Sequence, residues 1–245
     1  MQTVQAPSRP AGLSRPVAQR DWPAIETALE ADGFAVIPGL LDRQACAEMI
    51  AFYQRRDLFR SHVIMQHHGY GQGDYRYFAD PLPGPVERLR QELYRPLVPI
   101  ARRWAPGLGL DHRFADDLDG FRALCRAHGQ TRPTPLLLRY GPGDYNRLHQ
   151  DLYGAVAFPL QVAVLLSQPG EDFHGGEFLL VEQRPRMQSR GHVVPLGRGD
   201  GVIFANSQRP VPGKRGTFRV TMRHGVSTVR RGQRFCLGLI FHDAA

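Results

Sequence analysis

Two side chains that could bind a metal, His149 and Asp151, stand two residues apart at the end of a mixed apolar stretch. If this stretch is an extended strand, alternation places both side chains on one face, where they could bind the same ion. Two histidines and one carboxylate on one face of an octahedron, with the remaining positions open, are typical of non-haem Fe(II) centres that carry out oxygen chemistry. We therefore expect a third ligand from elsewhere in the chain and assign it to His224.

The residues around this pair make the pattern more specific, because a motif of two residues alone often arises by chance. A Gly-Pro-Gly turn at 141–143, preceded by an apolar run at 136–138, leads into the pair. The segment 219–226 alternates and carries His224, and Arg234 opens the last apolar run ten residues later. Each of these features alone is common by chance, but their combination is specific enough to support a metal site.

This combination of His-x-Asp, a distal His and an Arg ten residues beyond it resembles the 2-oxoglutarate-dependent Fe(II) dioxygenases. The resemblance implies that His149, Asp151 and His224 bind Fe(II), and that Arg234 binds the distal carboxylate of 2-oxoglutarate with help from the hydroxyl of Tyr140. The planar guanidinium suits that role because it can form two parallel hydrogen bonds to a carboxylate. The implied cofactor and co-substrates are Fe(II), 2-oxoglutarate and O₂.

The resemblance divides between two subfamilies with different substrates. The stretch from Arg139 to Asp151 looks like the AlkB-type nucleic-acid demethylases, although Leu138 replaces the Asn that they carry two residues before the Tyr. The nine residues between His224 and Arg234 match the prolyl-hydroxylase arrangement instead. The whole chain is most similar to bacterial oxygenases described as acting on damaged nucleic acid. We predict oxidative dealkylation of alkylated DNA or RNA, with a prolyl or peptidyl hydroxylase, a small-molecule hydroxylase and a non-catalytic metal-binding β-barrel as alternatives.

Composition adds a second argument for an anionic partner. The formal net charge is +8 and the pI is about 9.9, and such an excess of positive charge favours polyanions. The 31 basic residues include one lysine, Lys214, and the others are arginines. Arginine suits phosphate better than lysine does, because its planar guanidinium can form two parallel hydrogen bonds to it. A GC-rich coding sequence would leave the same bias, so the arginines alone do not identify a partner.

Residues 60–80 concentrate aromatic side chains, arginines and glycines. Rings interleaved with arginines on a flexible loop suit stacking on a base beside phosphate contacts, so we predict a possible substrate lid, with Arg60 a further phosphate ligand. The alternative is a hairpin whose rings pack on the core. The candidate substrate residues are Tyr75, Arg76, Tyr77 and Phe78.

The elements that position these residues suggest an α+β fold, a jelly roll (double-stranded β-helix) with N-terminal helices packed on it. Helical patterns run from Trp22 to about Ala31, from the N-cap residue Asp42 onward, and over 85–104. Strand patterns fall at 134–140, 145–151, 160–167, 177–183, 192–196, 200–205, 217–226 and 234–242. We divide the chain into a disordered basic tail (1–20), a helical and mixed portion with the possible lid (21–133), and a jelly-roll catalytic core (134–245).

The remaining features restrict the setting of the protein. No apolar run approaches the roughly 18 residues of a membrane-spanning helix, so no membrane association is expected. The cysteines, Cys46, Cys125 and Cys236, are few and widely spaced. They predict neither a disulfide framework nor a zinc site and favour a cytoplasmic location.

Overall fold

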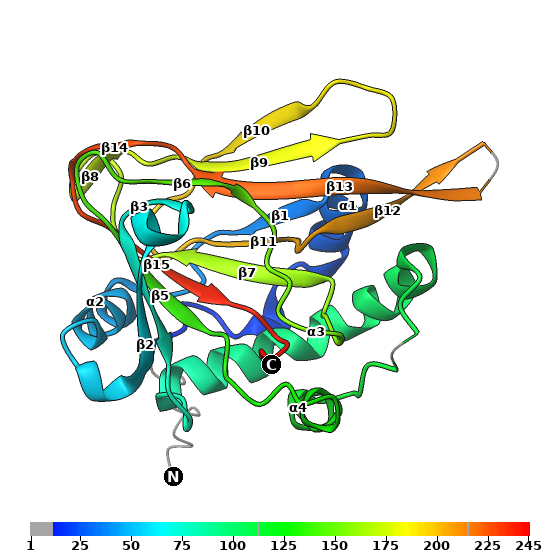
Figure 1. The fold of residues 1–245 in the computed structure, drawn as a ribbon, viewed down its shortest axis with the longest axis horizontal. Coiled ribbons are helices and arrows are strands. Elements are labelled where there is room, and N and C mark those ends of the chain that lie inside the picture. Colours follow the sequence, from blue (N-terminus) through cyan, green and yellow to red (C-terminus); the bar gives the residue numbers. More distant parts are fainter. Residues whose placement is uncertain (1–11, 112, 215) are drawn as a thin grey trace, which may run out of the picture.

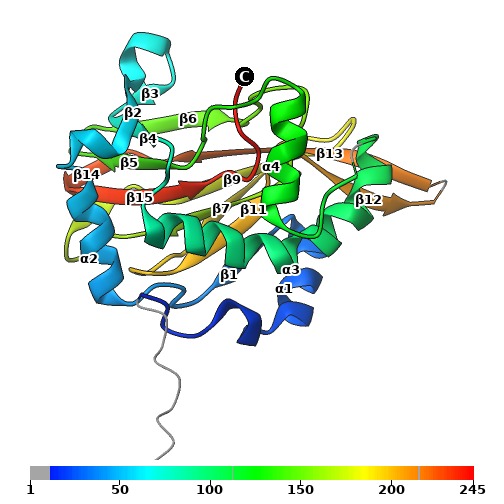
Figure 2. The same ribbon diagram turned by 90° about the horizontal axis from the view of Figure 1, so that it is seen from below.

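Two antiparallel sheets face each other, and helices cover the outer side of the larger one (Figure 1; Figure 2 gives the view from below). The structure, a computed structural model, describes residues 12–111, 113–214 and 216–245. The helices are α1 (Trp22–Asp32), α2 (Arg43–Phe52), α3 (Gly84–Leu108) and α4 (Leu118–Ala127), with short 3-10 helices η1 (Val17–Gln19), η2 (Arg56–Leu58) and η3 (Met65–His68). The strands are β1 (Phe34–Ile37), β2 (Phe59–Ile64), β3 (Gly71–Gln72), β4 (Asp74–Phe78), β5 (Leu136–Tyr140), β6 (Tyr145–His149), β7 (Leu160–Leu165), β8 (Phe173–Gly175), β9 (Phe178–Gln183), β10 (Arg190–Val194), β11 (Gly201–Ala205), β12 (Gln208–Gly213), β13 (Gly216–Val226), β14 (Val229–Gly232) and β15 (Arg234–Leu239).

The strand order is that of a jelly roll. The larger sheet runs β1-β11-β7-β15-β5-β4-β2, and the smaller one runs β10-β9-β13-β6-β3 with β12 paired to β13. Strands far apart in sequence therefore become neighbours, as where β15 inserts between β5 and β7. The predicted α+β fold with a double-stranded β-helix is confirmed, and each of the eight predicted strand segments overlaps a strand. The short strands β8, β12 and β14 and helix α4 were not predicted.

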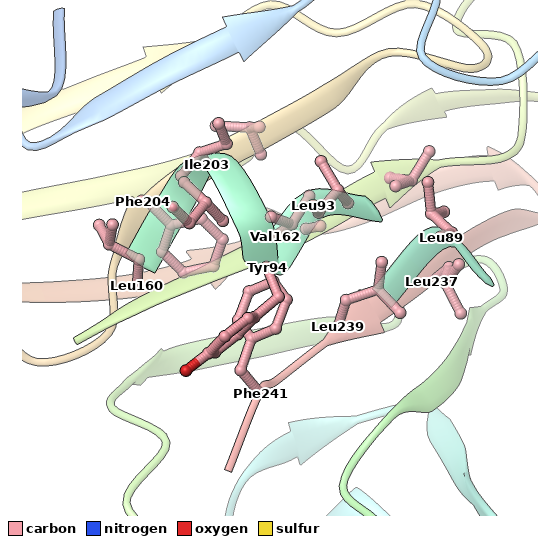
Figure 3. Packing of buried hydrophobic residues seen from close by; sticks show 14 of the residues in the cluster. Leu89, Leu93, Tyr94, Leu160, Val162, Ile203, Phe204, Leu237, Leu239 and Phe241 are labelled. Atoms are coloured by element: carbon pink, nitrogen blue, oxygen red, sulfur yellow. The ribbon is translucent and has the colours of Figure 1, made fainter. Parts of the chain in front are cut away.

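Helix α3 supplies the main packing surface under the larger sheet. Its residues Leu89, Leu93 and Tyr94 are buried against sheet residues that include Leu237 and Leu239 (Figure 3). Burying each side chain of this size contributes about 1.5–3 kcal/mol relative to exposure. Pro96, Pro99 and Pro106 all lie within this one helix. The helix thus holds one face of the sheet, and the opposite face is free to line an interior site.

The division predicted for the N-terminal half differs from the structure. Residues 1–11 of the predicted tail lie outside the described residues, whereas Leu13 and Val17 in its remaining part are buried in the core. That part of the tail is folded, contrary to the predicted disorder. Strands β1, β2 and β4 also belong to the same sheet as β5, β7, β11 and β15. The boundary predicted at residue 133 therefore separates no structural unit.

The segment 60–80 is mostly sheet. Strands β2 and β4 form a hairpin on the edge of the larger sheet, while β3 at its tip pairs with β6 of the smaller sheet. Gly71 allows this crossing, because its φ is +138° and a Cβ there would lie 2.3 Å from the carbonyl oxygen of Tyr145. Strands β2 and β4 thus form the hairpin that was the alternative to a flexible lid. The tip of this hairpin, from Met65 to Gly71, joins the two sheets.

Two expectations about the setting can be compared with the described residues. Within residues 12–111, 113–214 and 216–245, no helix is long and apolar enough to cross a membrane. Cys46, Cys125 and Cys236 are all buried and unpaired.

Candidate functional site

The two histidines of the predicted metal site lie opposite each other on neighbouring strands. His149 is the last residue of β6 and pairs in antiparallel register with His224 of β13, with ring centroids 4.1 Å apart. Asp151 follows β6 by two residues, and one potential ligand atom from each of the three side chains lies within 4.8 Å of the others. Among the described residues this is the only such group. The structure thus brings together the three residues that the sequence analysis assigned to iron.

The protonation of this cluster suits a divalent cation. His149 Nδ1 lies 2.7 Å from the carbonyl oxygen of Arg147, to which it can donate, and this leaves Nε2 free to bind a metal. Burial, and then the neighbouring His224, lower the pKa of His149, which favours the neutral imidazole. Burial alone would raise the pKa of Asp151, but hydrogen bonding and attraction from His224 outweigh it, and the pKa falls below its usual range. The site therefore offers nitrogen lone pairs and one carboxylate.

Asp151 is fixed by Tyr153 and Asn206, which the sequence analysis missed, and through Tyr153 by Tyr77, which it had assigned to the substrate. The Tyr153 hydroxyl donates to Asp151 Oδ1 over 2.7 Å, and the Tyr77 hydroxyl donates in turn to the Tyr153 oxygen over 3.0 Å. Asn206 Nδ2 donates to the Asp151 backbone carbonyl over 2.6 Å. Oδ2 of Asp151 lies 3.3 Å from His224 Nε2. These contacts hold the carboxylate in one orientation, with Oδ2 facing the histidine.

A buried arginine lies in the same interior. Arg234 is 1% exposed, and its Nε and Nη1 atoms have no hydrogen-bond partner. The register of β15 and β5 places it opposite Tyr140, whose ring centroid is 5.5 Å from the guanidinium carbon. Burial raises the pKa of Tyr140, so its hydroxyl keeps its proton at neutral pH. A buried cation with unpartnered donors is costly, and a carboxylate ligand would satisfy it.

These residues line one cavity of about 770 Å³ between the two sheets. Ala163 and Gly238 lie on its lining without filling it with bulky side chains, and Tyr75 and Tyr77 line it as well. Its arginines are Arg60, Arg132, Arg147 and Arg234. Of the described residues that line it, Asp151 has the only acidic side chain. The cavity is thus strongly basic around a metal-type cluster.

The candidate substrate residues divide according to the two faces of β4. Tyr75 and Tyr77 point into the cavity. Phe78 is instead 1% exposed and stacks on Phe59 at 4.7 Å, and Arg76 donates to the backbone carbonyl of Tyr53 over 2.7 Å. Arg76 and Phe78 therefore do not line the cavity, contrary to what their predicted contact with the substrate requires, because alternate residues of a strand face opposite ways. Arg60, the other proposed phosphate ligand, does line the cavity.

Comparison with known proteins identifies the family to which this chain belongs. Residues 73–244 match the model of a family described as an oxygenase catalysing oxidative methylation of damaged DNA. Uncharacterized proteins from two strains of Mycobacterium tuberculosis are 54% identical over 168 residues, which cover 69% of this chain and 72% of theirs. The family model spans β4 to β15 and therefore includes His149, Asp151, His224 and Arg234.

Solved structures support the same fold at low sequence identity. A Pseudomonas putida prolyl-4-hydroxylase superposes with a TM-score of 0.53 at 15% identity, over 91% of this chain and 100% of that one. A Burkholderia pseudomallei oxidoreductase of the 2-oxoglutarate–Fe(II) oxygenase family gives 0.51 at 18% identity, over 93% and 94%. The chain therefore belongs to the family described as oxygenases that catalyse oxidative methylation of damaged DNA, and its fold is that of the solved prolyl-4-hydroxylase and 2-oxoglutarate–Fe(II) oxygenase.

Proposed function

We propose that His149, Asp151 and His224 hold the Fe(II), and that Arg234 and Tyr140 hold the distal carboxylate of 2-oxoglutarate. The donor set supports the first assignment, since two imidazoles and one carboxylate are the ligands that non-haem Fe(II) oxygenases use. The unpartnered Nε and Nη1 of buried Arg234 support the second. When bound, iron and 2-oxoglutarate supply the activation of O₂ for oxidation of a substrate C–H bond, and 2-oxoglutarate is converted to succinate and CO₂.

We further propose that the substrate is alkylated nucleic acid. The observation that carries this proposal is the charge of the cavity, whose described lining residues include four arginines and a single acidic side chain. A base that leaves its stack to enter such a cavity would meet the rings of Tyr75 and Tyr77, while its phosphates would meet arginines at the mouth. Oxidation of an alkyl carbon attached to a base nitrogen gives a product that releases an aldehyde. The family description, which names damaged DNA, supports the same substrate class.

A panel of substrates tests this proposal directly. With Fe(II), 2-oxoglutarate and O₂, we expect methylated oligonucleotides to release formaldehyde in step with succinate, and proline-containing peptides to remain unmodified. Oligonucleotide affinity should also fall steeply with added salt, because phosphate contacts release counterions. Hydroxylation of a peptide, together with salt-independent or absent oligonucleotide binding, would assign the enzyme to the peptidyl hydroxylases instead.

Tyr153 provides a test of the metal assignment that does not require the substrate. Tyr153→Phe removes the hydroxyl that donates to Asp151 Oδ1, so the carboxylate loses its fixed orientation. We expect the affinity for Fe(II), or for Mn(II) as a stable substitute, to fall about 10- to 100-fold, as is typical for partners of metal ligands. Calorimetric titration measures this.

The matched control is Tyr145→Phe, which removes a hydroxyl on the same strand as His149 that does not touch Asp151. Its metal affinity should equal that of the wild type. An equal loss of affinity in both variants, or no loss in Tyr153→Phe, would show that the hydroxyl does not support the metal ligand.

A further inference from the structure

Exposed apolar side chains gather at the mouth of the cavity. Tyr70, Leu148 and Leu152 are 50%, 44% and 55% exposed, and all three line it. They come from three segments: the tip of the β2–β4 hairpin, strand β6 and the loop after β6. The other exposed large apolar side chains of the described residues are Ile64, Met187 and Val193, none of which lines the cavity. Exposed apolar side chains that line the same cavity as a metal-type cluster indicate a binding surface.

Tyr70 is held in place by the backbone on both sides of it. Its own N–H donates to the carbonyl of Met65 over 3.1 Å, and its carbonyl accepts from the N–H of Arg147 over 2.9 Å. The next residue, Gly71, makes the close approach to β6 described above. The ring of Tyr70 stacks on that of His68, with centroids 5.3 Å apart and planes at 20°. Tyr70 and His68 therefore form a fixed aromatic platform at the cavity mouth.

The chemistry around this platform fits a nucleobase. A half-exposed aromatic ring in a cavity that leucines also line favours a flat aromatic partner. Arg147 lines the same cavity, and its backbone N–H bonds to the carbonyl of Tyr70, so a positive charge is available for the adjoining phosphate. A base oxidised at the metal cluster must sit in the interior, so the next base along the strand is left at the mouth. We propose that this neighbouring base stacks on Tyr70, so that the enzyme binds at least a dinucleotide. This proposal rests on the proposed nucleic-acid function.

A fluorescent base tests the stacking contact independently of turnover. The probe is a single-stranded oligonucleotide with 2-aminopurine next to a methylated base, on either side in separate oligonucleotides. Stacking on an aromatic ring quenches this fluorophore. We expect binding to quench one of the two probes with wild-type protein and with Tyr70→Phe, which keeps the ring. With Tyr70→Ala the quenching should disappear, and affinity should fall roughly 5- to 150-fold, the loss expected for one stacked base.

The control variant is Ile64→Ala, which truncates an exposed apolar side chain of the same hairpin outside the cavity. It should bind and quench as the wild type does. Thermal melting of each variant checks that the hairpin tip still folds, and Tyr70→Phe separates loss of the ring from loss of the hydroxyl.

The outcomes distinguish this proposal from the one it rests on. If oligonucleotides bind and Tyr70→Ala quenches either probe as the wild type does, the neighbouring base lies elsewhere and the platform proposal is overturned. An equal affinity loss in Ile64→Ala would overturn it too. If the wild-type protein binds no oligonucleotide, the nucleic-acid function itself fails.

Discussion

Replacement of His149, Asp151 or His224 by alanine is expected to reduce 2-oxoglutarate-dependent succinate formation to background. Each side chain supplies one of the three ligand atoms that lie within 4.8 Å of one another, and no other group of this kind exists among the described residues to take over the ion. Succinate release and bound iron, measured on the same preparations, check this. Because no substrate is needed for uncoupled turnover, the result does not depend on the nucleic-acid proposal.

The comparison variant for this experiment is His67→Ala. His67 is an exposed residue of η3 that does not line the cavity, so iron content and succinate formation should match the wild type. Full turnover with wild-type iron content in any of the three ligand variants would disprove the metal assignment.

Arg234→Lys is expected to raise the apparent KM for 2-oxoglutarate more than tenfold. Lysine keeps the positive charge but offers a single nitrogen in place of the planar fork, and a tenfold change corresponds to roughly 1.4 kcal/mol. The buried position of Arg234 strengthens the effect, since neither of its unpartnered nitrogens can turn to solvent. Initial rates of succinate formation across a 2-oxoglutarate titration measure it.

Arg231→Lys is the matched variant for the co-substrate anchor. Arg231 lies on β14, three residues before Arg234, and is exposed. Its KM for 2-oxoglutarate should stay at the wild-type value. The opposite result would be a changed KM in Arg231→Lys and an unchanged KM in Arg234→Lys. It would show that Arg231, and not Arg234, binds the distal carboxylate of 2-oxoglutarate.

The sequence predicted the parts of the site that rest on local periodicity and spacing. His149 and Asp151 could be paired by alternation, and Arg234 by its position at the start of an apolar run. Local spacing could not reveal the hydrogen bond between Tyr77 and Tyr153, because 76 residues separate them and only the sheet pairing brings them together. The same limit hid Asn206, which reaches the Asp151 backbone from the end of β11.

The error at residues 75–78 had a signal in the sequence. If this segment is a strand, Tyr75 and Tyr77 share one face and Arg76 and Phe78 share the other, so all four cannot contact one substrate. The unpredicted strand β12 had a different cause. It carries Pro210 and Pro212, which lower strand propensity and are tolerated because β12 lies at a sheet edge.

Because the cavity has few acidic side chains, the binding of a metal and the binding of an anionic substrate should affect each other. Asp151 is the only one among the described lining residues, and it is also the side chain that we assign to iron. Before a metal binds, its negative charge opposes the entry of an anionic substrate. A divalent cation changes the summed charge of the three ligand side chains from negative to positive. If the metal strengthens the binding of a polyanion in this way, thermodynamic reciprocity requires that the bound polyanion strengthen the binding of the metal equally. On the nucleic-acid proposal, metal-free protein should therefore bind its substrate more weakly than metal-loaded protein does.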